Sequence, residues 1–188
     1  MICLEDTRYI KRHCDDELYN LLSDGRYCHI LESNGSGKSS LLVRTAERLR
    51  ETGREVIFIS CLGIDSQYWA NELIHELFQD SFLADTITEN EVINFLEKNN
   101  YGALIKMSDF IEKYLLSHNP IILIDDLEYL DKETRELLVT WVRSMWESSR
   151  SSEGENHVTF CLSGDVSFSG YRTPYNIGNK ISLTPSIE

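Results

Sequence analysis

The 188-residue chain has few basic residues, few prolines and no long apolar run. Its 18 lysines and arginines stand against 31 aspartates and glutamates, and the net charge of −13 argues against broad, non-specific binding to nucleic acid or to an anionic membrane. Three prolines and the lack of a low-complexity tract are typical of an ordinary globular chain. Because no leader-like segment and no long apolar segment occur, we expect neither a secretion signal nor a membrane span.

The five cysteines form no C-x-x-C pair and have no zinc-type spacing with the histidines. Cys28, Cys61 and Cys161 lie inside apolar, strand-like runs, where a reduced cysteine acts as a small hydrophobic residue. We therefore expect core cysteines and a cytoplasmic location. The length suits one domain with a sizeable core.

The most informative stretch is segment 32–39, which reads ESNGSGKS. It matches the phosphate-loop pattern G-x-x-x-x-G-K-[ST] except at the first position, where Glu32 replaces glycine. Gly35 and Gly37 permit a tight turn whose amide groups converge on phosphate oxygens. Lys38 is expected to reach the β- and γ-phosphates, and Ser39 to ligate Mg²⁺. The other predicted nucleotide-binding residues of this stretch are Ser33, Asn34, Ser36 and Ser40.

The flanking residues have the spacing that a phosphate loop requires. Residues 27–31 predict a short buried strand before the loop. Apolar positions from Leu41 to Leu49 recur at helical spacing after it, and Gly53 is a natural helix stop. The order of strand, loop and helix favours a real phosphate loop over a chance match.

A second motif lies at residues 120–128, where four consecutive isoleucines and leucines end in Asp125 and Asp126. Parallel α/β sheets bind ligands at the carboxyl ends of their strands. We expect Asp125 to hold Mg²⁺ and Asp126 to orient or deprotonate the attacking water. A further strand at 157–162 ends next to Ser163 and Asp165, one of which would be a polar sensor beside the γ-phosphate.

The remaining pattern predicts strands at 56–61 and 180–184 and several amphipathic helices. Ser66 is the candidate N-cap of one of these helices, and Asp131 is expected to cap another. A third helix is expected over residues 104–117. Tyr9 and Arg12 precede the first strand and are candidates for adenine or ribose contacts, although an ordinary surface role fits them equally well.

The chain resembles the AAA-like ATPase domain of bacterial, notably cyanobacterial, multidomain signalling proteins of the STAND type. The matching segments are 8–12, 16–19, 25–31, 37–50, 62–64 and 173–178. The resemblance covers nearly the whole chain. It implies an α/β P-loop NTPase core, a three-layer, doubly wound parallel sheet of five strands in the order 5-1-4-3-2, with helices on both faces. It also implies a single AAA-like core over residues 1–188, in which 1–25 form a helical lead-in and the family's lid and later domains are absent.

Three functions fit this resemblance. The leading prediction is an ATP-binding signalling switch that uses Mg²⁺ and slowly hydrolyses ATP to ADP and phosphate. The alternatives are a nucleotide-binding interaction module without turnover, such as a fragment of a larger AAA-like protein, and an AAA-type helper of DNA-acting machinery. Expected partners are the nucleotide and a protein, lid or effector domain, and an oligomer is left open. Arg143 and Arg172 are arginine-finger candidates by position only.

Overall fold

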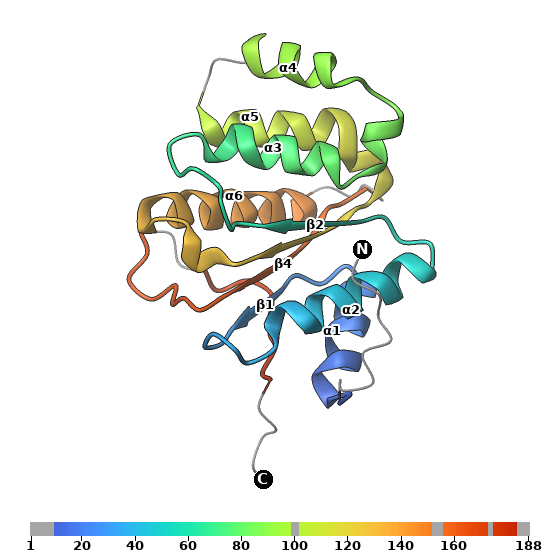
Figure 1. Ribbon diagram of the computed structural model, residues 1–188, viewed down its shortest axis with the longest axis vertical. Coiled ribbons are helices and arrows are strands. Elements are labelled where there is room, and N and C mark those ends of the chain that lie inside the picture. Colours follow the sequence, from blue (N-terminus) through green and yellow to red (C-terminus); the bar gives the residue numbers. More distant parts are fainter. Residues whose placement is uncertain (1–9, 99–101, 152–155, 173–174, 184–188) are drawn as a thin grey trace.

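The computed structural model describes residues 10–98, 102–151, 156–172 and 175–183. Its centre is a parallel five-stranded sheet in the order β2-β3-β4-β1-β5 (Figure 1). This is the predicted strand order, counted from the opposite edge. The strands are β1 (Cys28–Leu31), β2 (Val56–Ser60), β3 (Ile121–Asp125), β4 (Thr159–Gly164) and β5 (Asn179–Lys180).

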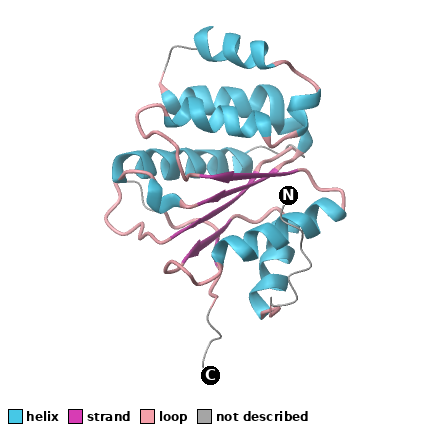
Figure 2. Ribbon diagram, viewed as in Figure 1, coloured by secondary structure: helices cyan, strands magenta, loops and turns pink. Residues whose placement is uncertain are grey.

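Helices cover both faces of this sheet (Figures 1 and 2). One face carries α1 (His13–Ser23) and α2 (Lys38–Glu51). The other carries α6 (Lys132–Ser151), against which α5 (Ala103–Phe110) and α3 (Trp69–Gln79) are stacked, with α4 (Glu89–Lys98) outermost. The predicted doubly wound α/β architecture is therefore confirmed. Short helical turns complete the chain: η1 (Phe82–Asp85), η2 (Ile111–Leu115), η3 (Leu116–His118) and η4 (Leu127–Tyr129).

Strand β3 shows why the apolar runs form doubly covered strands. Ile121 and Leu123 belong to the apolar core under α1 and α2, whereas Ile122 and Ile124 belong to the core under α3, α5 and α6. Alternate side chains of a strand point to opposite faces, so a continuous apolar run fills two cores at once. All five residues of β3 are buried.

Cys28, Cys61 and Cys161 are free and buried, as the sequence predicts, and Cys14 is buried as well. Burial raises the pKa of Cys28 and of Cys61 to about 12, which keeps both thiols protonated and unreactive. Cys28 and Cys161 are register partners on β1 and β4 within one apolar core. Their role is packing.

Several element boundaries differ from the predicted ones. Tyr68, not Ser66, is the N-cap of α3, because the hydroxyl of Ser66 accepts a hydrogen bond from the amide of Asp131 (3.2 Å) instead. The carboxylate of Asp131 caps α6 through the amide of Thr134 (2.8 Å), as expected. The predicted helix 104–117 is α-helical only to Phe110 and continues as the π-helical turn η2.

The ends of the last two strands also differ from the sequence pattern. Strand β4 runs on to Gly164, so Ser163 lies inside it, and β5 consists of two residues that begin at Asn179. The predicted end of the last strand, residue 184, lies outside the described residues. Among the described residues, no helix has both the length and the apolar character needed to cross a bilayer.

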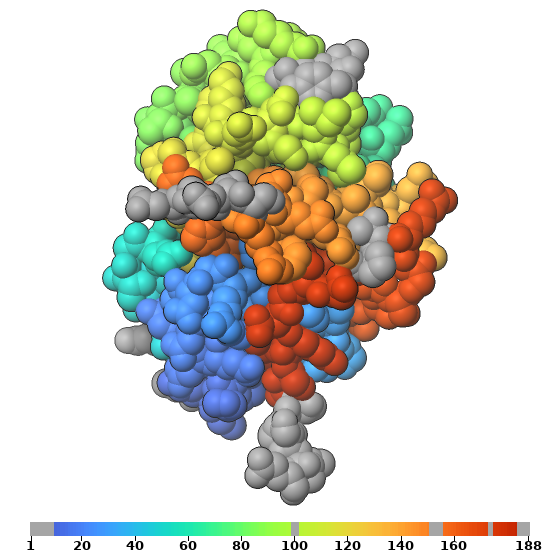
Figure 3. All heavy atoms as spheres, turned by 180° about the vertical axis from the view of Figure 1, so that it is seen from behind, coloured from blue at the N-terminus to red at the C-terminus, as the bar shows by residue number. Residues whose placement is uncertain are grey.

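Gly178 controls how closely β5 approaches β1. It has a φ of +75°, and a Cβ atom there would lie 2.6 Å from the carbonyl oxygen of Tyr27. That oxygen accepts the hydrogen bond from the Asn179 amide (2.7 Å) that starts the β1–β5 pairing. Seen from behind, the C-terminal segment accordingly lies directly against the N-terminal third of the chain (Figure 3).

Replacement of Gly178 by alanine is therefore expected to lower the free energy of unfolding by about 2–3 kcal/mol, measured by urea denaturation. Gly53→Ala is the matched control, because Gly53 has a similar φ of +79° but no atom within 4 Å of its would-be Cβ. The control should lose only the conformational part, about 1 kcal/mol. Equal losses in the two variants would contradict the role assigned to the close approach.

Candidate nucleotide-binding site

The predicted phosphate loop connects β1 to α2 and turns at its two glycines. Gly35 and Gly37 have φ values of +79° and +94°, in the left-handed region that glycine adopts without strain. Gly37 is also the N-cap of α2. The loop therefore ends at a helix N-terminus, where backbone amides and the helix dipole favour an anion.

Lys38, the first residue of α2, is 6% exposed and folds back over the loop. Its Nζ atom donates to the carbonyl oxygens of Glu32 (2.8 Å) and Ser33 (3.1 Å). The ammonium thus lies where the loop encloses it, with one hydrogen still to donate. Ser39 and Ser40 follow on α2, and both are exposed.

The structure also accounts for Glu32 at the first position of the loop. Positive φ angles of non-glycine residues are confined to Asn119 and Asp126 among the described residues, so Glu32 has an ordinary backbone conformation and needs no glycine. Its carboxylate turns away toward the last strand and accepts from the hydroxyl of Ser182 (3.3 Å). The loss of the first glycine leaves the turn intact.

Arg12, from the segment before α1, reaches the same loop. Its Nη1 donates to the carbonyl oxygen of Ser36 (3.1 Å), and its Nη2 lies 3.3 Å from the position of a would-be Cβ on Gly37. Any side chain at position 37 would press against this guanidinium. The second N-terminal candidate, Tyr9, lies outside the described residues.

Asp125 is the last residue of β3, and its carboxylate is buried. It is 1% exposed, and neither carboxylate oxygen has a hydrogen-bond partner among the described residues. An orphaned buried carboxylate is costly unless it is paired or ligates a metal. The residues therefore fit Mg²⁺, which takes one or two protein oxygens together with phosphate oxygens and water. In the described part of the chain, no group of three or more histidine, cysteine or carboxylate side chains is placed to hold a metal ion by itself. Asp125 and Ser39 are the residues that the sequence predicts as metal ligands.

Asp126 adopts a left-handed conformation, with φ of 62° and ψ of 36°, directly after β3. The hydroxyl of Ser60, at the end of β2, donates to its Oδ2 atom (2.6 Å). Ser60 and Asp125 are register partners at the ends of β2 and β3, and this brings Ser60 close to Asp126, the next residue of the chain. The hydrogen bond fixes the direction in which the Asp126 carboxylate points.

The end of β4 lies between the phosphate loop and β3. Ser163 pairs in register with Ile30 of β1, is fully buried, and its hydroxyl has no partner among the described residues. Asp165 follows and accepts a hydrogen bond from the amide of Asn34 in the loop (3.0 Å). The amide of Asp165 donates to Oε2 of Glu128 (2.9 Å), which links the loop to the turn after β3.

Ser60 and Glu128 touch the candidate site and are absent from the sequence-based predictions. A signal for Ser60 does exist in the sequence, because this polar residue ends a predicted strand, and the carboxyl ends of parallel strands lie at one edge of the sheet. Glu128 gives no comparable signal in the sequence. Arg143, one arginine-finger candidate, bonds Glu147 and Asn176 on the surface, and the amide of Arg172 bonds Glu136.

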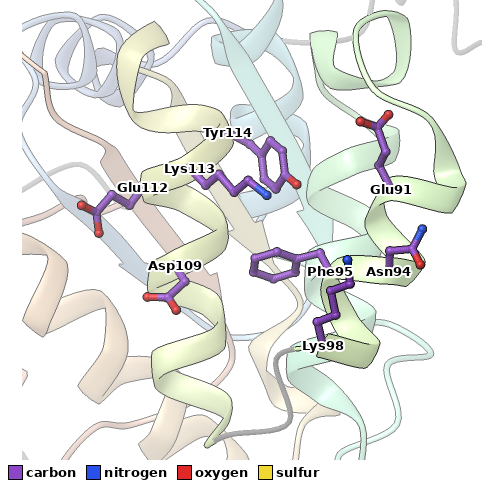
Figure 4. Close-up of a pocket in the computed structure, with 8 residues that line it drawn as sticks. All are labelled: Glu91, Asn94, Phe95, Lys98, Asp109, Glu112, Lys113 and Tyr114. Atoms are coloured by element: carbon purple, nitrogen blue, oxygen red, sulfur yellow. The ribbon is translucent and has the colours of Figure 1, made fainter.

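A groove of about 700 Å³ lies elsewhere, between α4 and the facing α5–η2 segment. Figure 4 shows Phe95 of α4 and Lys113 of η2 pointing into the space between the helices, while Glu112 points away from it. Lysine and carboxylate side chains are mixed along its walls. The groove contains none of the loop residues and is separate from the candidate nucleotide site.

The fold and the site together define a P-loop NTPase. The chain matches, over residues 27–182, the family described as an ATPase domain predominantly from Archaea. This match covers most of the chain, and the protein therefore belongs to that family of P-loop ATPase domains. Its AAA-like character, predicted from the sequence, agrees with this membership.

The similar proteins are longer than this chain, which spans less than half of each of them. An uncharacterized WD repeat-containing protein from Synechocystis is 26% identical over 94% of this chain, which spans 16% of that relative. Cdc6p from Pyrobaculum aerophilum has a TM-score of 0.57 at 12% identity, over 94% of this chain and 48% of that one. Drosophila ORC bound to DNA has a TM-score of 0.52 at 10% identity, over 89% of this chain and 29% of that one. At such low identities these structures are similar in fold alone.

Proposed function

We propose that this domain is an ATP-binding, slowly hydrolysing switch of the STAND type, and that it acts in signalling through a protein partner or a lid and effector domain. The observation that carries the proposal is that one site combines two features. One is a buried lysine at the end of a loop that turns at two glycines, and the other is a buried aspartate without a hydrogen-bond partner among the described residues. Lys38 follows the loop after β1 and Asp125 ends β3, so both lie at the carboxyl edge of one sheet, with β4 between their strands. Such an arrangement fits a nucleotide phosphate chain with its magnesium ion.

Each part of the site has a distinct task in this proposal. The loop amides from Asn34 to Ser40 hold the phosphate chain, and Lys38 stabilises negative charge on the transferred phosphoryl group. Ser39 and Asp125 would hold Mg²⁺, which when bound neutralises charge on the phosphate oxygens. Asp126, directed by Ser60, orients or deprotonates the attacking water.

The remaining candidate residues are assigned to recognition and sensing. Arg12 already contacts the loop, and we assign it, with Tyr9, to the ribose and adenine end of the nucleotide. Ser163 has a buried hydroxyl without a partner, which suits a contact to the γ-phosphate. Asp165 accepts a hydrogen bond from the amide of Asn34, so its carboxylate would compete with the phosphate chain for this donor. Hydrolysis would then change the charge that this polar end of β4 faces.

A role in DNA-acting machinery is the second candidate. It is favoured by the fold shared with Cdc6p and with ORC, which was solved bound to DNA. The net charge of −13 weighs against it. Binding of labelled duplex DNA over a salt series would separate the candidates, because phosphate contacts by basic residues give a steep salt dependence.

Equilibrium binding of fluorescent ATP and ADP, with and without Mg²⁺, tests the leading proposal. Lys38→Ala is expected to weaken ATP binding about 10- to 100-fold, because it removes a charge-assisted contact to phosphate. Lys132→Ala, which removes an exposed lysine at the start of α6, is the matched control and should leave the affinity unchanged. A folded wild-type protein that binds neither nucleotide would refute the proposal, and binding without phosphate release would favour the non-hydrolysing module.

A further inference from the structure

Lys106, on α5, is a buried cation outside the candidate nucleotide site. Its residue is 8% exposed, and its Nζ atom donates to the side-chain oxygen of Asn71 on α3 (3.0 Å). No carboxylate of the described residues forms an ion pair with it. An ammonium group has three donors, and a buried charge with one neutral partner is poorly compensated.

This side chain lines a small cavity of about 190 Å³ between α5 and the first turn of α3. Tyr68, Trp69 and Ala70 form the opposite wall. The cavity is smaller than the roughly 300 Å³ at which pockets for drug-sized ligands begin. It suits a small ion or a single functional group rather than a nucleotide.

The first turn of α3 forms the facing wall of this cavity. Tyr68 is the N-cap of this 11-residue helix and supplies no side-chain cap. The amides of Asn71 and Glu72 donate to the carbonyl oxygen of Tyr68, whereas those of Trp69 and Ala70 donate to no atom of the described residues. Trp69 and Ala70, at the positive end of the helix dipole, line this cavity together with Lys106.

The carboxylates of Glu72, in the first turn of α3, and of Asp65, in the loop before it, bond backbone amides rather than Lys106. Glu72 accepts the amide of Asp65 (2.7 Å), and Asp65 accepts the amide of Gln67 (2.8 Å). Both acids are thus engaged by the backbone of the loop before α3. Neither acid is an ion-pair partner of Lys106.

We propose that the cavity lined by Lys106 and the first turn of α3 binds a small oxyanion of the phosphate class. Helix N-termini and lysine side chains are both common phosphate binders, and this cavity is lined by one of each, from two elements. The site is distinct from the phosphate loop, because α3 follows the edge strand β2 and two strands separate β2 from β1. A bound oxyanion would join α3 to α5.

Phosphate titration monitored by thermal unfolding at constant ionic strength tests this site. The experiment uses the Lys38→Ala protein, so that the phosphate loop contributes little and the outcome does not depend on the proposed nucleotide function. Phosphate is expected to raise the Tm saturably, and adding Lys106→Met should weaken the response at least tenfold. Lys113→Met, which removes an exposed lysine of η2 outside the cavity, is the matched control and should keep the response.

A second measurement protects the test against a variant that fails to fold. In the folded Lys38→Ala protein, phosphate should shift the backbone amide resonances of Trp69 and Ala70 in a heteronuclear NMR spectrum. The proposal is overturned if these resonances stay in place, or if the Tm response survives in a folded Lys106→Met variant. It is also overturned if acetate at equal concentration gives the same response, because the site would then not be selective for a tetrahedral oxyanion.

Discussion

Replacement of Asp126 by asparagine is expected to lower the rate of phosphate release from ATP about 10²- to 10⁴-fold. Asparagine keeps the size of the side chain and an oxygen that accepts from the Ser60 hydroxyl, but it cannot take a proton from water. It also tolerates the left-handed conformation at this position, where φ is 62°. The loss should therefore reflect chemistry rather than a change of structure.

Single-turnover phosphate release, measured beside nucleotide affinity, is the informative assay. The affinity of the Asp126→Asn protein for ATP should change by no more than about threefold, since the role proposed for Asp126 acts on water rather than on binding. Asp131→Asn is the matched control: it removes the same charge from the same connection, and asparagine is an equally good N-cap for α6. An Asp126→Asn protein that releases phosphate at the wild-type rate would show that this carboxylate has no catalytic task.

The second large effect concerns Trp141, on the face of α6 that packs against the sheet. Its side chain is 1% exposed, its ring lies edge-on to Phe160 of β4 at 5.1 Å, and its Nε1 donates to the hydroxyl of Ser108 on α5 (3.2 Å). One residue thus joins the sheet, α6 and α5. Trp141→Ala is expected to lower the free energy of unfolding by about 3–5 kcal/mol, measured from urea midpoints at matched slope.

Trp141→Phe divides this loss into its parts. Phenylalanine retains an aromatic contact to Phe160 but gives up the hydrogen bond to Ser108 and some volume, so we expect a loss of about 1–2 kcal/mol. A Trp141→Ala protein destabilised by less than 1 kcal/mol would mean that the layers around α6 are held together elsewhere.

The parts of the fold that the sequence predicts well are those specified by local pattern. Continuous apolar runs indicated doubly covered strands, and Ile121 to Ile124 fill both cores as that pattern requires. The glycines of the loop and the aspartates at the end of β3 are placed by the spacing of their own motifs. The strand order came from family resemblance, because periodicity alone carries no information on which strands are neighbours.

The contacts that sequence could not supply are long-range and depend on the path of the loops. Asp165 meets the amide of Asn34 across 131 positions, and Arg12 meets Ser36 across 24. Local spacing does not encode either contact. The N-cap of α3 was mispredicted for the same reason, since Ser66 has a tertiary partner in Asp131 that competes with local capping.

The neighbours of β1 have a consequence for the order in which the protein is made. Strand β1 spans residues 28–31, but its two partners in the sheet, β4 and β5, begin at residues 159 and 179. Contacts of such high sequence separation form late, because a long loop must close, at a cost in chain entropy, before these contacts can stabilise the fold. A nascent chain therefore carries the complete loop sequence early in translation but has no sheet to hold it. We expect it to acquire nucleotide affinity only once β4 has left the ribosome.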